Sequence, residues 1–320
     1  MNELPGELED YWADFRRSLA RRGRSEATVL VYRKSFVPFW AWATSVGIVD
    51  PAEVDHKVIN AWCDHMLTQV ARRNDRTIYE TDMTGQSVPK MLEASTRRIR
   101  YANLRPFFSW YSKEFDAPNP FERSDPPGDD RPAPIPMVEL DDIRRLLSTC
   151  TTREFSDLRD AAVIRILFDT GARLGEVVAM TVYGWERRND LLTLIAKTGK
   201  RVVPVSPTTG EALSRYLRVR AKHPKADSSA MWLGPKGALG QTGIGQLLRR
   251  RCELAGVDHI NPHKLRHTWA HQYRAQGGSE GDLMYLAGWS STTMAHRYGR
   301  SAANEHAQSA ARKIALGDRL

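Results

Sequence analysis

The sequence predicts a mainly helical protein with one small β-hairpin, an α+β fold in two domains. Apolar residues recur at helical spacing in several segments, and two short apolar runs flank a turn that contains glycine. One proline-rich segment separates two regions that each have enough apolar residues for a core. With 41% hydrophobic and 27% charged residues, the 320-residue chain has the composition of a globular protein.

The first domain is predicted over residues 1–121 as a helical bundle. Its first helix carries apolar residues at helical spacing, namely Leu8, Trp12, Phe15 and Leu19. Ser25 is placed to cap a second helix, because its hydroxyl can accept a hydrogen bond from an unpaired N–H of the first turn. We expect a third helix near residues 58–70 and a fourth over residues 95–115.

Residues 122–137 are polar and rich in proline, without apolar periodicity, and we interpret them as an extended linker. The second domain is then residues 138–320. It is predicted to contain helices over residues 139–150 and from Ser156 to Gly171, followed by a hairpin with strands at 191–196 and 201–205. The remainder is predicted to be helical and to end in an amphipathic tail helix that stops near Gly317.

The charge distribution suggests a polyanionic partner. The formal net charge is +9. Residues 1–121 hold 17 Lys and Arg against 16 Asp and Glu, and residues 122–320 hold 30 against 22, so the positive excess lies in the second domain. Clustered basic side chains release condensed counterions from a phosphate backbone, which makes nucleic acid the expected partner class.

The cysteines and the N-terminus favour a cytoplasmic protein. Cys63, Cys150 and Cys252 are odd in number and far apart, so they indicate neither a disulfide framework nor a zinc ribbon. The first ten residues lack the basic and apolar regions of a signal peptide, and no stretch is apolar enough to span a bilayer.

Two arginine-centred segments suggest a phosphate site. Asn261 and Pro262 are typical first residues of a helix, and they place His263 and Arg266 on its first turn, where the helix dipole favours an anion. Arg173 begins another helix after a break at residues 170–171. Two guanidinium groups on one phosphate can balance the charge that develops when a nucleophile adds to phosphorus.

Plainer interpretations of these residues stay open at this point. Arg173 could simply pair with Glu176 at the surface. His263, His267 and His271 are four residues apart and could line one helix face as zinc ligands, although position 264 is Lys where the metalloprotease helix has Glu. The histidines could also serve only packing or capping.

Three segments together resemble the catalytic signature of the tyrosine recombinase (phage integrase) family. They are Thr-Gly-Ala-Arg-Leu-Gly-Glu at 170–176, His-Lys-Leu-Arg-His at 263–267 and Gly-Trp-Ser-Ser-Thr-Thr-Met-Ala-His-Arg-Tyr at 288–298. The separation of nine residues between Trp289 and Tyr298 is also similar to the family's. The resemblance implies that Arg173 and Arg266 hold the scissile phosphate while Tyr298 attacks it. Supporting roles fall to Glu176 and His267.

The resemblance also implies a lysine at the tip of a β-hairpin that protonates the leaving 5′ oxygen. Lys197 and Lys200 both lie in the predicted turn, and the 24 residues between Arg173 and Lys197 favour Lys197. Lys200 would then contact only phosphate. At position 289, where many members have His, the Trp ring N–H can donate a hydrogen bond but cannot carry a proton, so His263 is the acid/base candidate beside Lys197.

The similarity extends over nearly the whole chain. Residues 1–121 resemble the helical core-binding (SAM-like) domain that clamps DNA, and residues 138–320 resemble the mixed, mainly helical catalytic domain. In the clamp, basic residues of the fourth helix are DNA-binding candidates on one face of that helix: Arg97, Arg98, Arg100 and Arg105. Arg24, Ser25 and Thr28 are weaker candidates for phosphate contacts.

The implied activity is site-specific DNA recombination through a 3′-phosphotyrosyl intermediate, for integration or excision of a phage or mobile element. Alternatives are a Xer-like recombinase for chromosome or plasmid dimers, a type IB topoisomerase, and an inactive DNA-binding regulator. Neither ATP nor a metal is implied, because the covalent intermediate conserves the phosphoester bond and the cationic side chains supply the charge. The expected partners are double-stranded recombination sites, other protomers in a synaptic homotetramer and an accessory directionality factor. We expect a monomer in free solution and no membrane partner.

Overall fold

The computed structural model describes residues 5–73, 76–128, 137–196 and 199–289, together with Ser291 and Arg312. The chain divides into two compact units, Met1–Ala133 (unit 1) and Pro134–Leu320 (unit 2). Within the described ranges, no helix combines the length and apolarity needed to cross a membrane.

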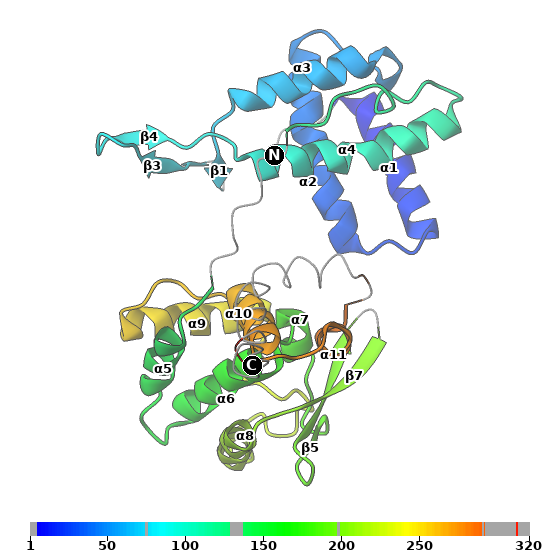
Figure 1. Ribbon diagram of the computed structural model, residues 1–320. Helices are drawn as coiled ribbons and strands as arrows, with labels where there is room; N and C mark the ends of the chain where they lie inside the picture. The colour runs from blue at the N-terminus through cyan, green and yellow to red at the C-terminus, as the bar shows by residue number, and fades with distance from the viewer. Residues whose placement is uncertain are drawn as a thin grey trace, which may run out of the picture. The chain divides into compact units, whose positions relative to one another are not determined.

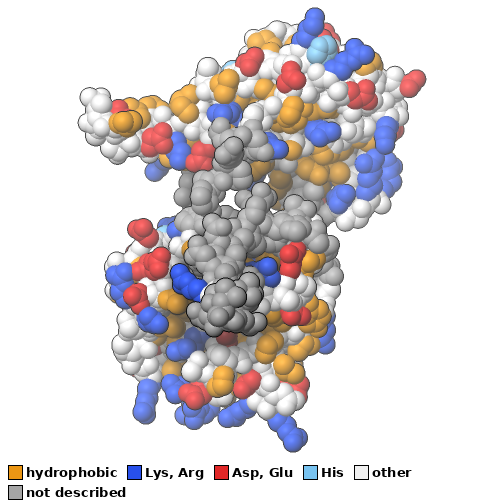
Figure 2. Space-filling model, viewed as in Figure 1, with side chains coloured by type: hydrophobic (Ala, Val, Ile, Leu, Met, Phe, Trp, Pro, Cys, Tyr) orange, Lys and Arg blue, Asp and Glu red, His pale blue; other side chains and the backbone are white. Residues whose placement is uncertain are grey.

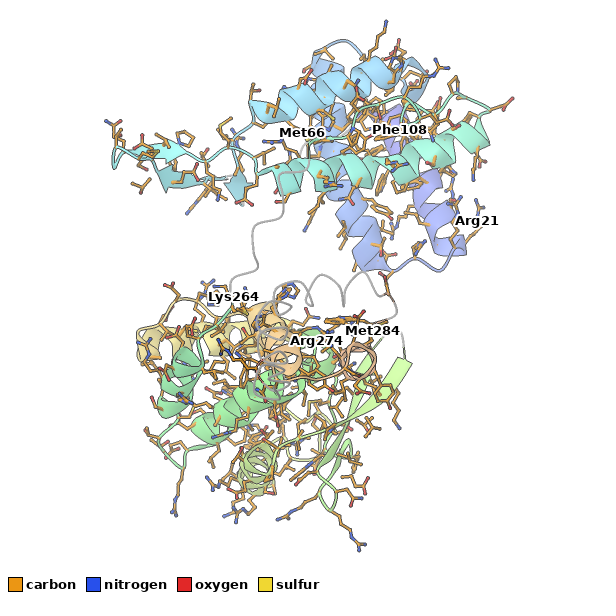
Figure 3. All side chains as sticks on the ribbon, viewed as in Figure 1. Arg21, Met66, Phe108, Lys264, Arg274 and Met284 are labelled. Atoms are coloured by element: carbon orange, nitrogen blue, oxygen red, sulfur yellow. The ribbon has the colours of Figure 1, made fainter. Side chains whose placement is uncertain are left out.

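Unit 1 is built around one central helix. Its helices are α1 (Gly6–Arg21), α2 (Glu26–Ser45), η1 (Pro51–Glu53), α3 (His56–Leu67) and α4 (Ala94–Glu114). α4 contacts α1, α2 and α3, and their shared core is largely aromatic. Figure 3 labels two of its members, Met66 of α3 and Phe108 of α4, whose exposed fractions are 0% and 1%. Ser25 caps α2 as predicted, accepting a hydrogen bond from the Thr28 N–H at 3.3 Å.

Unit 1 also contains short strands that the sequence analysis missed. They are β1 (Arg72–Arg73), β2 (Arg76–Thr77), β3 (Tyr79–Thr81) and β4 (Ser87–Pro89), which pair antiparallel as β1 with β2 and β3 with β4. Figure 1 shows β3 and β4 projecting from the helices of unit 1. The expectation of an all-helical bundle is therefore wrong between α3 and α4. Strands of two or three residues, nearly all exposed, leave no alternating apolar pattern to detect.

The first part of the predicted linker lies against unit 1. The backbone N–H of Asp125 donates to Oδ1 of Asn60 in α3 at 2.9 Å, and the Tyr101 hydroxyl of α4 is 2.7 Å from the Ser124 hydroxyl. Residues 129–136 lie outside the described ranges. On the other side, the N–H of Val138 donates to the Thr268 hydroxyl at 2.9 Å within unit 2.

Unit 2 packs its helices around α6 beside a three-stranded antiparallel sheet. The elements are α5 (Leu140–Ser148), α6 (Phe155–Thr170), α7 (Leu174–Val178), β5 (Trp185–Glu186), β6 (Leu191–Ala196), β7 (Gly199–Pro204), α8 (Pro207–Arg220), β8 (Leu233–Gly234), β9 (Gly237–Ala238), α9 (Gln241–Ala255), α10 (Pro262–Ala275) and α11 (Glu280–Ala287). α6 contacts α7, α8, α9 and α10. The sheet order is β5-β6-β7, and α11 contacts both β7 and α10 (Figure 1).

A buried ion cluster joins α6 to α9. Asp160, whose side chain is fully buried, accepts hydrogen bonds from Arg159, Arg250 and Arg251, the last from Nε at 2.8 Å. Arg251 also donates from Nη2 to Asp157 at 2.7 Å. Burying a carboxylate is costly unless charged donors surround it, so this cluster fixes the packing of the two helices.

Candidate active site

Arg173 is held at the start of α7 by its own capping partner. α6 ends at Gly171, whose φ of 57° reverses the chain, and Arg173 is the residue before the first turn of α7. Its backbone N–H donates to Oε2 of Glu176 at 2.7 Å, and its Nη1 donates to Oε1 at 3.0 Å. The Arg173 side chain remains 39% exposed although it is anchored in this way.

Arg266 is anchored from the opposite direction, on α10. Asn261 caps this helix as predicted, accepting a hydrogen bond from the Lys264 N–H at 2.9 Å. Arg266 is buried and donates from Nη1 to the Gly171 carbonyl at 2.6 Å and from Nη2 to the Ala287 carbonyl at 2.7 Å. Gly171 is thus both the turn before Arg173 and an acceptor for Arg266, which brings the two predicted arginines together.

Three arginines donate hydrogen bonds to the C-terminal end of α11. Three successive carbonyls there each accept one guanidinium N–H: Leu286 from Arg201 at 2.8 Å, Ala287 from Arg266 at 2.7 Å and Gly288 from Arg173 at 2.9 Å. The last carbonyls of a helix lack intrahelical partners and carry the negative end of the helix dipole. Figure 3 shows α10, marked by Lys264 and Arg274, beside α11, marked by Met284.

Arg201 belongs to this arrangement and was missed by sequence reasoning. It lies on β7, where the exposed and buried side chains alternate, and its side chain is 8% exposed. Its Nη1 and Nη2 donate to the two oxygens of Glu176 at 2.5 and 2.8 Å. The available signal was its position two residues before Val203, which places both side chains on the inner face of the strand.

Glu176 is a buried carboxylate shared by two arginines, with an exposed fraction of 2%. Burial alone would raise the pKa of its carboxyl, but hydrogen bonds from Arg201 and from the Arg173 backbone outweigh it and hold that pKa below its ordinary value. The simple surface pairing considered from the sequence is therefore wrong, since Glu176 lies inside the unit and binds Arg201 as well as Arg173.

Two of the predicted histidines are in direct contact. Nε2 of His263 lies 2.6 Å from Nε2 of His267, so one ring must donate and the other accept. His263 is exposed and His267 is buried, so the exposed ring is the one that can reach a ligand. His271 is also buried, one turn further along α10. Among the described residues, no three side chains of the metal-ligating types converge.

Trp289 packs under the arginine pair. It is 8% exposed and contacts a small apolar cluster with Trp269, Leu283 and Ala287. The guanidinium carbon of Arg266 lies 5.3 Å from the centre of the Trp289 ring, within the range of a cation–π interaction. Trp289 therefore supports the position of Arg266, a contact that the sequence comparison did not suggest.

Two predicted catalytic residues, Lys197 and Tyr298, lie outside the described residues, as does most of the predicted tail helix. The placement of Lys200 in the hairpin turn is wrong. Lys200 pairs with Ile195 inside the β6–β7 ladder, and its exposed side chain lies on the face of β7 opposite to Arg201. The strand begins two residues earlier than expected because Gly199 and Lys200 continue the ladder.

The DNA-binding candidates of unit 1 do not share one face. Arg98 and Arg105 are exposed and seven residues apart on α4, so they lie on the same side. Arg97 and Arg100 are partly buried, and Arg97 donates to the Leu92 carbonyl at 2.8 Å. Arg98 and Arg105 are therefore the more accessible of the four candidates.

A second basic region lies where α1 meets α2. Figure 2 shows Lys and Arg side chains gathered at this end of unit 1, near the residue that Figure 3 labels as Arg21. Arg21, Arg22 and Arg24 are exposed there, next to the capping residues Ser25 and Thr28. This end of the unit offers positive charge beside a helix N-terminus.

Comparison with known proteins places these residues in context. A model of the phage integrase family matches residues 136–305, just over half of the chain. The tyrosine recombinase XerD of Caulobacter vibrioides is 31% identical over 199 residues, which cover 59% of this chain and 65% of the relative. The tyrosine recombinase XerC of Corynebacterium glutamicum is 26% identical over 262 residues, covering 74% and 84%. The match to the XerD relative thus spans slightly less than two thirds of its length.

Solved structures show the same fold. The Tn1549 transposon integrase in complex with transposon right end DNA has a TM-score of 0.70 at 17% identity, covering 95% of this chain and 99% of that one. A lambda integrase tetramer bound to a Holliday junction has a TM-score of 0.64 at 15% identity, covering 91% and 76%.

Proposed function

Because this chain belongs to the phage integrase family, whose tyrosine recombinases cleave and rejoin DNA, we propose that it is a site-specific DNA recombinase with Tyr298 as nucleophile. The observation that carries the proposal is the convergence of Arg173 and Arg266. Their guanidinium groups hydrogen-bond to the adjacent carbonyls of Gly288 and Ala287, one residue before and two before Trp289.

In the proposed reaction, Tyr298 attacks the scissile phosphorus and His263 accepts its proton as the bond forms. The 3′ side of the strand becomes linked to the tyrosine oxygen and the 5′ oxygen leaves. Lys197 gives that oxygen its proton. Arg173 and Arg266 bind the non-bridging oxygens, whose negative charge increases in the transition state. A 5′-hydroxyl from the partner duplex then attacks the phosphotyrosyl link and releases Tyr298.

The remaining residues complete the proposed site. His263 exchanges protons at the phosphate, with its ring fixed by His267, and the Trp289 ring N–H donates to a phosphate oxygen. Arg98, Arg105 and the basic end around Arg24 contact the DNA backbone from unit 1. Two duplexes and four protomers form the synaptic complex, consistent with the tetramer of the lambda integrase relative.

The biological role that we propose is integration or excision of a mobile element, for which the Tn1549 integrase provides the structural parallel. The identity to XerC and XerD proteins favours a second candidate, resolution of chromosome or plasmid dimers. Sequencing the junctions that the protein forms in a host strain distinguishes them. Joined element ends indicate integration or excision, and resolved dimers at a single chromosomal or plasmid site indicate the second role.

A nicked suicide duplex tests the proposed chemistry. The wild type should form a covalent protein–DNA adduct that migrates as a slower band on a denaturing gel, and Tyr298→Phe should bind the same site without forming it. Tyr285→Phe is the matched control, because Tyr285 is 64% exposed on α11 and has no proposed role. An adduct in Tyr298→Phe would assign the nucleophile to another residue. In a separate assay on a supercoiled plasmid, relaxation without joint products would indicate a topoisomerase instead.

A further inference from the structure

Arg201 takes part in the arrangement without facing an open site. Its side chain is buried, and its Nε, Nη1 and Nη2 all have protein partners, one carbonyl of α11 and the two oxygens of Glu176. A guanidinium held in this way is a poor candidate for direct contact with DNA. Its three hydrogen bonds instead join β7, α7 and α11, the three elements around Arg173.

The charge count around Glu176 explains what Arg201 contributes. Each Glu176 oxygen is shared: Oε1 accepts from Arg201 at 2.5 Å and from the Arg173 side chain at 3.0 Å, while Oε2 accepts from Arg201 at 2.8 Å and from the Arg173 backbone at 2.7 Å. One carboxylate thus lies between two guanidinium groups. If only Arg173 were present, the pair would be neutral. With Arg201, one positive charge remains.

Geometry assigns that remaining charge to Arg173. Arg201 forms the bidentate pair with Glu176, whereas Arg173 uses only one guanidinium nitrogen for Glu176 and keeps a side chain that is 39% exposed. Without Arg201, the buried Glu176 carboxylate would lose two charged hydrogen bonds and would draw Arg173 into a bidentate pair, because a buried charge with too few donors is strongly unfavourable. That movement would take the Arg173 guanidinium away from solvent.

We propose that Arg201 is a positioning residue that neutralises Glu176 and thereby keeps Arg173 available to a phosphate. The inference rests on the proposed function, in which Arg173 binds the scissile phosphate. It predicts that loss of Arg201 impairs cleavage through Glu176 rather than through loss of folding.

The test combines Arg201→Met with a matched control, Arg220→Met. Arg220 is also buried, at 5% exposed, and its partners are backbone carbonyls between Ala226 and Met231, outside the site. Both variants should lower the melting temperature to a similar extent. Only Arg201→Met should slow single-turnover cleavage of the suicide duplex, by about tenfold or more, with the Kd for a half-site nearly unchanged.

Two further variants separate positioning from a structural role. Adding Glu176→Gln to Arg201→Met removes the buried negative charge that would draw Arg173 into a neutral pair, so the double variant should cleave faster than Arg201→Met alone. Arg201→Lys keeps the charge but loses the bidentate geometry, so its cleavage rate should lie between those of Arg201→Met and the wild type. If Arg201→Met does not fold, a reduced but measurable rate in Arg201→Lys serves as the test. Equal loss of cleavage in Arg201→Met and Arg220→Met, or no recovery in the double variant, would overturn the proposal. So would a folded Arg201→Lys that cleaves no faster than Arg201→Met.

Binding of orthovanadate, measured by calorimetry on the full chain, keeps this inference separate from the proposed function. Vanadate has the shape and charge of phosphate and needs no nucleophile. If the wild type forms no adduct with DNA, the proposed recombinase chemistry fails. Weaker vanadate binding in Arg201→Met than in the wild type and Arg220→Met would still support the role of Arg201. Equal binding in all three, or none in the wild type, would refute it.

Discussion

Gly171 controls both arginines of the site through its backbone. Its φ of 57° ends α6, its carbonyl accepts a hydrogen bond from Arg266 at 2.6 Å, and an added Cβ would come within 2.1 Å of Cε3 of Trp269. Any side chain at this position must therefore displace the Trp269 ring, and the carbonyl that orients Arg266 would move with it.

We predict that Gly171→Ala destabilises unit 2 by about 3 kcal/mol, combining left-handed backbone strain with overpacking. The matched control is Gly256→Ala, which has a similar φ of 62° but no atom within 4 Å of the added Cβ. It should cost only about 1 kcal/mol. Urea unfolding measures the free energy of unfolding of both variants. Equal losses of stability would mean that the Trp269 ring moves aside at little cost.

Lys197 and Lys200 should respond differently to a change of leaving group. We expect Lys197→Ala to lose cleavage of ordinary DNA and to recover it on a duplex whose leaving 5′ oxygen is replaced by sulfur, because a thiolate leaves without a proton. Lys200→Ala should not need this rescue, since Lys200 lies within a strand ladder on the face opposite to Arg201. Gel assays measure cleavage of both duplexes by both variants. Rescue of Lys200→Ala rather than Lys197→Ala would assign the general-acid role to Lys200.

The sequence predicts the residues of the site better than it predicts what holds them. The helix ends at Asn261 and Gly171 can be predicted from the local sequence, because capping and chain reversal depend on neighbouring residues. Arg201 gave no such signal. Its partners lie 25 residues away at Glu176 and 85 residues away at Leu286, and only the folded chain brings them together.

At the level of elements, the ion cluster between α6 and α9 should make stability depend on pH. Burial alone would raise the pKa of the Asp157 carboxyl, but the hydrogen bonds from Arg251 and Thr152 outweigh it and lower that pKa from 3.8 to about 2. A lowered folded-state pKa stabilises the protein above the unfolded value, and the contribution disappears as pH falls through the folded one.

We therefore predict that the wild type loses about 1 kcal/mol of this stabilisation between about pH 4 and pH 2, whereas Asp157→Asn lacks it throughout. Urea unfolding at successive pH values measures the two stability curves, which should converge over this window. Asp141→Asn is the control, because Asp141 lies on α5 with a side chain that is 80% exposed. If the stability curves of the wild type and Asp157→Asn stay parallel over this pH range, the hydrogen bonds between Asp157 and Arg251 do not stabilise the protein.

The elements that could be predicted are those with a strong period. α1 follows from its apolar spacing, whereas β1 to β4 were missed because each strand has two or three residues. The fourth helix was placed within one residue of α4 at each end, but the partial burial of Arg97 and Arg100 was not predicted. Periodicity predicts which face of a helix meets the core. It does not predict the burial of Arg97, which donates to the Leu92 carbonyl in the segment just before α4.

For the molecule as a whole, the two units have separate cores. The core residues of one lie between Leu8 and Phe121, and the large core of the other lies between Val138 and Leu265. Each apolar core is contained within its own unit, so mutations in one should leave the internal packing of the other intact.

The charge of the chain predicts a steep salt dependence of DNA binding. Most of the +9 net charge lies beyond residue 121, and unit 1 adds exposed arginines at the junction of α1 and α2. With about five phosphate contacts, log K should fall with log salt at a slope of about −4.5. Gel-shift titrations over a range of salt concentrations measure it. Replacing Arg21, Arg22 and Arg24 by Gln should reduce the slope, and replacing Arg144, exposed on α5 beside Asp141, is the control.

The end of α11 has a consequence for how this protein can change over generations. Its three carbonyls belong to the backbone, and every amino acid supplies a carbonyl, so these hydrogen bonds do not themselves depend on side-chain identity. Packing restricts the side chains separately, because Leu286 lies against the core and Ala287 is fully buried. What cannot vary is the count of residues. Inserting or deleting one residue would give each arginine the carbonyl that now serves its neighbour. Selection here should act on spacing in addition to identity, so this stretch should tolerate neither an insertion nor a deletion.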